Sequence, residues 1–541
     1  MSSYLDQNTQ YLRKFINLSY QFFSHRAIQI ILLLAFAGLF FLRNAWVAED
    51  AYINFRSIEQ LFAGNGPVWN AHERVQVYTS PLWYGLLAFS RVFSSNLYVN
   101  SLILSALCYF ALLLYIIRSG IRPTTLAALI MLQLSSLAFF DFTSSGLETV
   151  LQLMLLTFLM VNIFEQSPLT SNNAKLRRRF LLLLGVMLCV RHDTLPLILP
   201  ISTAVFIAGI RLDGWRYTLK SAIWAALPLL AFTVFSVIYY GFPFPNTAYA
   251  KLNTGIPGTE LTQQGLIYLQ ENWLHDPITL TISVSFIVFA CLPKQSFTVR
   301  LLALGVLLQL LYIIKVGGDF MLGRFLAYGY WVACLSLVFW LENIHRISTR
   351  FMLILLMIGV GYSTFSPRAP IATPTSYTNH TIKHGIADER AFYSPSLSLT
   401  AYWDFLQGRA PYYNFPYNDF SLQARKFNQT QTDFAIYSNI GIFGYLADLD
   451  VKLVDPLALS DPFLARLPVT GEWRIGHFPR EIPSEYIREL KGLPYHFDNP
   501  ELESLHSDIR LITRSEDLFS KVRWQAIIRQ NMSFVKNTHE S

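Results

Sequence analysis

The stretch Glu49-Asp50-Ala51-Tyr52-Ile53-Asn54-Phe55-Arg56 follows a strongly apolar run at 27–42. Two adjacent carboxylates therefore stand at the mouth of an expected membrane helix. After them, apolar residues recur at helical spacing as far as position 62, and Gly64-Asn65-Gly66-Pro67 ends the pattern. The sequence predicts a short amphipathic helix on the membrane surface, with both acids at its start.

The two acids allow two interpretations. Asp50 could simply cap the helix, because Asp favours helix N-termini and the positive end of the helix dipole. A carboxylate at a lipid–water boundary is also well placed to act on a lipid-linked substrate. Capping alone does not require a second acid at Glu49, and this stretch leaves both interpretations open.

The composition indicates a multi-pass membrane protein. Of the 541 residues, 53% are apolar and 14% are charged, unlike a soluble globular protein. The net charge of +7 does not indicate nucleic-acid binding, because most basic residues stand in short loops, where they set membrane orientation. The cysteines, at 108, 189, 291 and 334, lie in apolar segments and give no metal spacing or disulfide framework. The first apolar run lacks a cleavage pattern, so we expect it to be retained.

We expect about eleven membrane spans, at 27–43, 98–117, 124–140, 147–164, 180–192, 194–210, 221–240, 277–292, 299–315, 326–343 and 350–365. The segment 81–93 is too short to cross a bilayer and is predicted to lie on its surface. Every second loop then carries at least two Lys or Arg and faces the cytoplasm: 118–123, 165–179, 211–220, 293–300 and 341–350. If 81–93 crossed, all later loops would be inverted and the positive-inside rule would be broken.

These spans predict a mainly α-helical protein in three parts. Residues 1–26 form a cytoplasmic N-terminal segment, and residues 27–365 form the membrane domain, whose first periplasmic loop is 44–97. An odd number of spans places 366–541 in the periplasm, where its mixed strand-like and helical runs predict a smaller soluble α/β or α+β domain. Within it, Ile440-Gly441-Ile442-Phe443-Gly444 resembles a nucleotide-binding turn only weakly, and we favour a close-packed strand-to-helix turn.

The chemically loaded stretches all fall on the periplasmic side in this topology. They are Glu49-Asp50, 141–148, Arg191-His192-Asp193, 244–251 and 317–324. Ionisable groups that converge at span ends on one side predict a polar cavity open to the periplasm. The three ionisable groups at 191–193 are costly between apolar runs without partners, which favours a functional role.

Other polar stretches have structural alternatives. Ser145 and Glu148 have the spacing of a capping box, which we favour there over catalysis. Lys251 alone could be a lysine that reaches to the membrane interface. Gly317-Gly318-Asp319 could be a simple turn, or its glycines could let backbone amides and Arg324 approach an anion.

This set of residues suits glycosyl transfer from a lipid phosphate. A polyprenyl phosphate leaves as an anion, so it needs nearby cations and no general acid, while the acceptor hydroxyl needs one carboxylate base. A glycosidase would need two opposed carboxylates. One acidic pair with scattered Arg, Lys and His fits transfer better.

Several motifs together carry a family resemblance. They are Glu49-Asp-Ala-Tyr52, Ala63-Gly-Asn-Gly-Pro67, Tyr78-Thr-Ser-Pro-Leu-Trp83, Pro245-Asn-Thr-Ala-Tyr-Ala-Lys251 with Gln264-Gly265 and Tyr268, Gly318-Asp-Phe-Met-Leu-Gly-Arg324, Val454-Asp455-Pro456, Leu459-Ser-Asp461-Pro462, and Gly476-His477 with Arg480, Pro483 and Tyr486. The combination resembles the GT-C membrane glycosyltransferases across most of the chain. It is most similar to the terminal β-(1→2)-arabinofuranosyltransferases of mycobacterial cell-wall arabinan and their relatives in other bacteria.

The resemblance implies inverting transfer of a sugar, expected to be arabinofuranose, from a polyprenyl-phosphate donor. The acid of the first loop acts as general base in that family, and this role maps onto Asp50, with Glu49 beside it. The resemblance also implies the bacterial inner membrane, with an active site on the periplasmic face. It leaves open whether a divalent cation such as Mg²⁺ or Mn²⁺ takes part, and we name no metal ligand.

We assign the remaining candidates by charge. The expected ligands of the donor phosphate are Arg191, His192, Lys251 and Arg324. The expected ligands of the sugar or acceptor are Asn54, Tyr78, Glu148, Asp193, Asn246, Asp319 and His477. The C-terminal region is expected to shape the acceptor groove through His477, Asp455, Asp461 and Arg480.

The expected partners are the polyprenyl-phosphate sugar, a glycan, lipid-linked or protein acceptor, and the bilayer, without nucleic acid. Two alternatives remain: transfer of another lipid-linked sugar to protein or lipid A, and transport of a lipid-linked sugar. A transporter is expected to show inverted repeats and polar sites at the membrane midplane. The sequence has no repeat, and its polar groups fall on one side.

Overall fold

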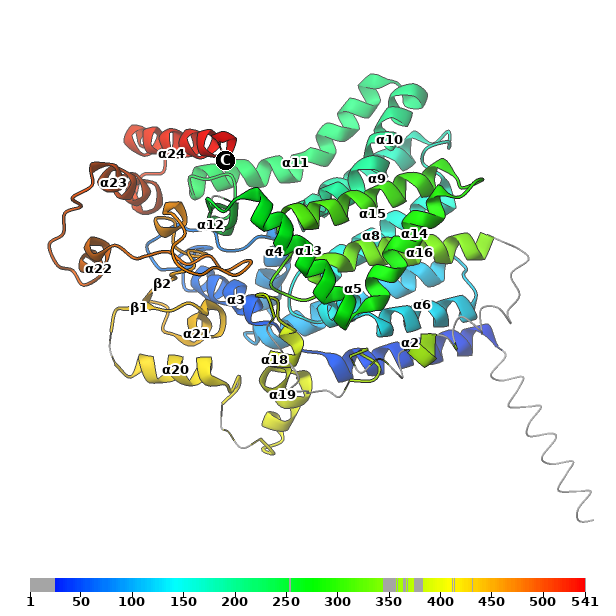
Figure 1. Cartoon of the computed structure of the whole chain (residues 1–541), viewed down its shortest axis with the longest axis horizontal. Coiled ribbons are helices and arrows are strands. Elements are labelled where there is room, and N and C mark those ends of the chain that lie inside the picture. The colour runs from blue at the N-terminus through cyan, green and yellow to red at the C-terminus, as the bar shows by residue number, and fades with distance from the viewer. Residues whose placement is uncertain are drawn as a thin grey trace, which may run out of the picture.

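The structure is a computed structural model that describes residues 25–252, 254–343, 357, 359–362, 366, 368–373, 383–410, 412, 414–430 and 432–540. Most of the expected eleventh span at 350–365 and nearly all of the N-terminal segment 1–26 lie outside these residues. The molecule is mainly helical, as predicted, with long helices side by side and the C-terminal elements α20 to α24 gathered at one end of the bundle (Figure 1).

In the described part of the chain, seven helices are long and apolar enough to cross a membrane, and two bent pairs would raise the number to nine. The seven are α2 (Arg26–Asn44), α5 (Leu97–Arg118), α8 (Thr149–Gln166), α10 (Leu195–Asp213), α11 (Trp215–Tyr239), α15 (Phe297–Lys315) and α16 (Ala327–Asn343). The bent pairs are α6 (Pro123–Ser135) with α7 (Leu137–Phe140), at 90°, and α13 (Gly258–His275) with α14 (Pro277–Cys291), at 112°. The multi-pass character is thus confirmed, while the count of eleven stays a prediction.

The first loop forms two short helices, as its pattern predicts. They are α3 (Glu49–Phe62) and α4 (Pro81–Arg91), and the 11 residues of α4 are too few to cross a bilayer. Ser80 caps α4 by accepting a hydrogen bond from the backbone of Trp83, and Pro81 occupies the first turn. The remaining helices of this half are α9 (Ala174–Leu188) and α12 (Asn246–Leu252).

The C-terminal region is mostly helical, with one small parallel sheet. Its elements are α18 (Glu389–Leu397), α19 (Leu399–Leu406), α20 (Asp419–Asn428), β1 (Phe434–Ile436), α21 (Ile440–Leu446), β2 (Lys452–Val454), α22 (Ser484–Leu490), α23 (Pro500–Arg514) and α24 (Lys521–Glu540). Phe434 pairs with Lys452 and Ile436 with Val454, so α21 connects two parallel strands. The glycine motif at 440–444 therefore opens a helix that packs closely, which agrees with the favoured interpretation.

Buried polar contacts join the C-terminal region to the first loop. The fully buried guanidinium of Arg56 donates to the carbonyls of Gly444 at 2.6 Å, Val451 at 3.0 Å and Ala447 at 3.1 Å. Asn70 exchanges two hydrogen bonds with the backbone of Leu453, at 2.9 and 3.1 Å. A charge-assisted hydrogen bond contributes about 1.5–3 kcal/mol, so this docking resists separation.

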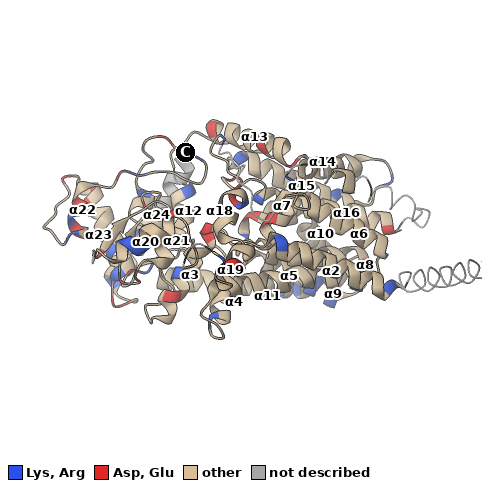
Figure 2. Ribbon diagram, turned by 90° about the horizontal axis from the view of Figure 1, so that it is seen from below, with Lys and Arg blue, Asp and Glu red and all other residues tan. Residues whose placement is uncertain are grey.

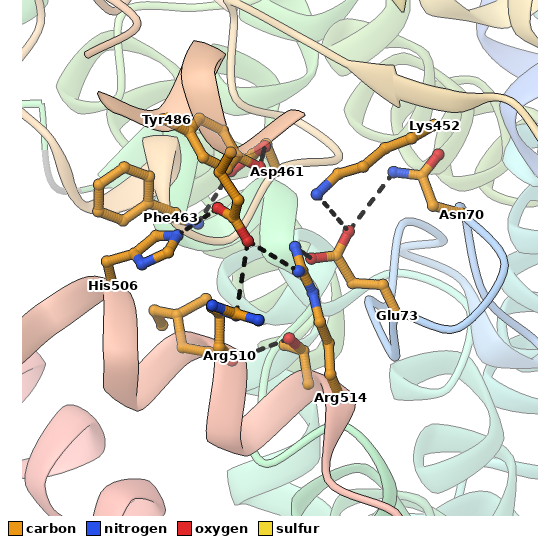
Figure 3. A network of polar contacts seen from close by, with 12 residues as sticks. Asn70, Glu73, Lys452, Asp461, Phe463, Tyr486, His506, Arg510 and Arg514 are labelled. Atoms are coloured by element: carbon orange, nitrogen blue, oxygen red, sulfur yellow. Dashed lines mark hydrogen bonds and ion pairs between the residues drawn. The ribbon is translucent and has the colours of Figure 1, made fainter. Parts of the chain in front are cut away.

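A network of charged side chains extends this docking (Figure 3). Arg514 of α23 reaches Glu73 of the first loop at 3.2 Å and Glu489 of α22 at 3.1 Å. His506 approaches the same Glu489 at 2.7 Å, and Lys452 lies 3.9 Å from Glu73. Burial would raise the pKa of Glu489, but His506 and Arg514 outweigh it and lower that pKa to about 2. Glu489 therefore stays charged, and the network holds over the physiological pH range.

Candidate active site

Charged residues gather where the bundle meets the C-terminal region, around α7 and α18 (Figure 2). The start of α3 is fixed there by the turn before α8. The backbone of Ala48 donates to Ser145 O at 2.8 Å, and the indole of Trp46 donates to Asp141 O at 2.7 Å. These bonds hold Asp50 against the span ends that carry Glu148 and Arg324.

Asp50 faces these cations with a partly open carboxylate. Its side chain is 30% exposed, and its Oδ2 lies 3.9 Å from Nη1 of Arg324. Burial raises the pKa of Asp50 above its ordinary value, although Arg324 and Lys251 act in the opposite direction. The N-cap of α3 is Ala48, and no side chain caps this helix. Asp50 is therefore not the cap, and its oxygens are free to accept a proton from a ligand.

Two arginines converge on one buried carboxylate behind Asp50. Oε1 of Glu148 accepts from Arg191 Nη1 at 2.5 Å and from Arg324 Nη2 at 3.2 Å. Arg191 is also held by Asp193, through Nε at 2.8 Å and through Nη2. Burial would raise the pKa of Glu148, but Arg191 and then Arg324 overcome this and hold it below its usual value. The guanidinium groups thus have fixed positions before any ligand binds.

The capping box expected at 145–148 is wrong. Glu148 is itself the N-cap residue of α8, and no side chain caps that helix. Two cations recruit the Glu148 carboxylate instead, because a buried charge is stable only when it is paired.

Two buried polar atoms of this site lack hydrogen bonds. Among the described residues, Nε of Arg324 and Oδ2 of Asp319 have no hydrogen-bond partner, although the two residues are only 8% and 6% exposed. Asp319 Oδ2 does lie 3.9 Å from Arg324 Nη1. An unsatisfied buried polar group costs about 1–3 kcal/mol, so these atoms are suited to a polar ligand.

Lys251 completes the cationic side. Its side chain is exposed, its Nζ stands 5.8 Å from the centre of the Phe320 ring, and Asp319 and Asp50 are its leading acidic neighbours. The two glycines before Asp319 serve packing, because a Cβ on Gly318 would lie 2.4 Å from the ring of Tyr268. The Tyr268 hydroxyl in turn donates to Met321 O at 3.1 Å, which shapes the loop that presents Asp319.

Glu49 points away from this group. Its carboxylate is buried and accepts a hydrogen bond from the backbone N–H of Ile442, at the start of α21, at 3.1 Å. Burial, and then the neighbouring Asp50, raise the pKa of Glu49 to about 8. The acidic pair is thus divided: Asp50 faces the cations, and Glu49 holds the C-terminal region.

Several expected ligands make structural contacts in the described part of the chain. The Tyr78 hydroxyl pairs with Tyr240 at 2.9 Å, and Asn246 donates to Ala458 O at 2.8 Å. Asp455 accepts from the backbone of Leu457 and Leu459, Asp461 accepts from Tyr486, and Arg480 donates to Ala250 O. His192 is exposed, and its ring forms no hydrogen bond or ion pair with a described residue. Their proposed sugar and phosphate contacts stay predictions.

Two further expected ligands, Asn54 and His477, lie on α3 and beside Phe320, respectively. Asn54 follows Asp50 by one helical turn and is half-buried on α3. The His477 ring meets Phe320 edge to face, with centres 4.6 Å apart. Burial, then Arg474 and Lys251, lower the pKa of His477 to about 3, so the imidazole is neutral at pH 7.

Sequence reasoning missed Glu389 and Arg474. Glu389 is half-buried at the start of α18, and its leading charged neighbours are Asp50, Glu49, Arg474 and Asp319. Burial, and then those acids, raise its pKa well above the ordinary value. The stretch around it has no apolar repeat or span end that could have signalled this position.

Two curated proteins are similar to this chain. A terminal β-(1→2)-arabinofuranosyltransferase of Mycobacterium tuberculosis is 25% identical over 549 aligned positions, which cover 84% of this chain and 85% of that protein. A terminal β-(1→2)-arabinofuranosyltransferase of Corynebacterium glutamicum is 28% identical over 330 positions, 52% of this chain and 46% of its own length. No family model and no solved structure matches. The resemblance expected from the motifs is confirmed, and it supports a glycosyltransferase.

Proposed function

We propose that this protein is an inverting glycosyltransferase that moves arabinofuranose from a polyprenyl-phosphate donor to a cell-envelope acceptor. One observation carries the proposal: the partly exposed carboxylate of Asp50 stands 3.9 Å from Arg324, beside a cluster of buried ion pairs. The names of the two similar proteins support arabinofuranose as the transferred sugar. The proposed site lies on the periplasmic face of the bacterial inner membrane, which the loop charges support.

The proposed reaction breaks the bond between the anomeric carbon and the phosphate oxygen, and the bonding electrons leave with the phosphate. The acceptor hydroxyl attacks the opposite face of that carbon, so the configuration inverts. Asp50 takes the proton of the hydroxyl as general base. Arg324, with Lys251 beside it, stabilises the departing phosphate by charge-assisted hydrogen bonds, and Arg191 holds the cluster in place.

The described residues do not offer a ready metal site. No group of three or more His, Cys, Asp or Glu side chains among them could hold a metal ion. The cationic side chains around Asp50 are themselves suited to a phosphate. The proposed reaction therefore uses side chains of the protein alone.

The test is an incubation of the purified protein in detergent with a panel of polyprenyl-phosphate sugars and an arabinofuranosyl oligosaccharide. We expect the arabinofuranosyl donor to be consumed and the oligosaccharide to gain one arabinofuranosyl residue, with the anomeric configuration inverted relative to the donor. Consumption of another donor would assign a different sugar, and no consumption of any donor would reject the proposal. Reporter fusions test the membrane side: a fusion after Lys220 should report cytoplasm and one after Lys251 periplasm.

A transporter for a lipid-linked sugar is the second candidate. The two helix pairs bent by 90° and 112° favour it, because broken helices often form transport sites. Movement of a labelled lipid-linked sugar across proteoliposomes without any transfer would support this alternative.

A further inference from the structure

Glu389 comes from the C-terminal region yet lies beside the proposed base. Residues 386–388 run next to 320–322, because Ala387 N donates to Phe320 O at 2.8 Å and Leu322 N donates to Ala387 O at 3.0 Å. Asp388 caps α18 by accepting from the backbone of Ala391 at 3.0 Å. These contacts fix Glu389 in the first turn of α18, next to the loop that presents Asp319.

The start of α18 is also fastened to the helix that precedes α3. Arg390 is buried and donates to Asn44 Oδ1 at 2.5 Å and to Asp141 Oδ1 at 3.2 Å. At the other end of α18, Val47 N donates to Leu397 O at 3.2 Å. Glu389 and Asp50 are therefore held by the same rigid junction, so their relative position is fixed.

The Glu389 carboxylate is not used by the fold. It is half-buried and forms no hydrogen bond or ion pair with any residue that the structure describes. Its leading basic neighbour is Arg474, whose half-buried guanidinium donates to the neutral imidazole of His477 at 2.9 Å. Arg474 also lies 5.9 Å from the centre of the Phe320 ring, which has Lys251 at 5.8 Å.

Charge separates the two sides of this region. Arg191 and Arg324 are paired to Glu148 on the side of the membrane helices, while Glu389 approaches Asp50 from the C-terminal region. Oδ2 of buried Asp319 and Nε of buried Arg324 have no hydrogen-bond partner among the described residues, so they are suited to polar groups of a ligand. A phosphate suits the arginine side and is repelled from the carboxylate side.

We infer that Glu389 and Arg474 bind the acceptor, and that this acceptor is a neutral saccharide. The inference rests on the proposed function and deepens it. The carboxyl group of Glu389 exchanges hydrogen bonds with sugar hydroxyls in either protonation state, and the guanidinium of Arg474 donates to their oxygens, so together they orient one hydroxyl toward Asp50. An acceptor with a phosphate or uronate near the reacting hydroxyl would face Glu389, Asp50 and Asp319, and is disfavoured.

The experiment measures transfer kinetics of Glu389→Gln with two acceptors: a neutral arabinofuranosyl oligosaccharide and the same compound with a phosphate beside the terminal sugar. A hydrogen bond to a charged group is worth about 1.5–3 kcal/mol, so the KM for the neutral acceptor should rise about 10- to 100-fold. The KM for the donor should stay unchanged, and discrimination against the phosphorylated acceptor should weaken. Arg474→Gln should raise the acceptor KM in the same direction.

The matched control is Glu485→Gln, which changes a half-buried Glu in the first turn of α22, far from the site (Figure 1). It should leave both KM values unchanged. If Glu389→Gln melts early, Glu389→Asp provides the test, because it keeps the carboxyl group but shortens its reach. An unchanged acceptor KM in a normally melting Glu389 variant would overturn the inference and leave the proposed function intact. A wild-type protein that transfers no sugar would overturn both.

Discussion

Replacement of Gly441 by alanine tests whether the C-terminal region positions the proposed base. Gly441 is the second residue of α21, and a Cβ built on it would lie 2.2 Å from Glu49 O and 2.6 Å from Glu49 Oε1. Ordinary contacts begin at 3.4 Å, so α21 and the start of α3 must separate by about 1.2 Å, which is 3.4 minus 2.2. The clash involves backbone, which a rotamer change cannot relieve.

Two opposed effects set the stability of Gly441→Ala. Alanine favours a helix over glycine by roughly 0.5–1 kcal/mol, whereas overpacking costs about 1–3 kcal/mol. We therefore expect a net loss of about 0–2.5 kcal/mol, small enough for the protein to fold. Asp50 directly follows Glu49, and a misplacement of about 1 Å near a reaction centre can lower a rate by about 10²-fold. The transfer rate should therefore fall by about that factor.

The assay is a single-turnover transfer rate at saturating donor and acceptor, paired with a thermal melt in detergent. Gly85→Ala is the matched control, because Gly85 is also helical and a Cβ there has nothing within 4 Å. That variant should be more stable than the wild type by roughly 0.5–1 kcal/mol, because it gains the helix preference without a clash, and it should turn over like the wild type. A Gly441→Ala protein with a wild-type transfer rate would refute the coupling between the C-terminal region and Asp50.

Three further predictions concern single charges. Asp50→Asn should lower the transfer rate by roughly 10²–10⁴-fold, since an amide cannot take the proton. Its free energy of unfolding should fall by no more than the lost helix-dipole energy of about 0.3–1 kcal/mol. A near-normal turnover would exclude Asp50 as the general base. Arg324→Ala should raise the donor KM strongly and Arg324→Lys should recover only part, because an ammonium lacks the planar fork; an unchanged donor KM would make Arg324 structural. The folded protein keeps the Glu49 proton up to about pH 8, whereas the unfolded chain loses it near pH 4.5, so the stability of the protein should fall as pH rises between these values. Thermal melts across this pH range test this. A Glu49→Gln variant whose melting temperature falls with pH as steeply as that of the wild type would contradict it.

Local sequence signals were enough to place the proposed base. The apolar run before Glu49, the helical spacing after it and the stop at Gly64 predicted α3 with Asp50 in its first turn. Span ends with matching loop charges also predicted that the stretches with Arg191 and Arg324 would converge with Glu49-Asp50 on one side of the membrane. Such signals work because membrane insertion fixes which ends of the helices lie together.

Contacts between distant segments could not be predicted. Glu49 lies 393 residues from Ile442, and no periodicity of the first loop indicates that α21 will bind its carboxylate. Glu148 has the spacing of a capping residue, yet two arginines from other spans recruit it, because pairing of buried charge outweighs a cap worth about 1 kcal/mol. The position of Glu389 depends on the backbone pairing of residues 386–388 with residues 320–322, and no sequence motif indicates this pairing.

The division of the acidic pair has a consequence for catalysis. Neighbouring residues on a helix point about 100° apart, so Glu49 and Asp50 face different sides of α3. A pKa of about 8 keeps Glu49 largely protonated at pH 7, which removes a negative charge next to Asp50. The same Glu49 side chain holds α21, so the docking of the C-terminal region and the charge on the residue before the proposed base depend on one carboxyl group.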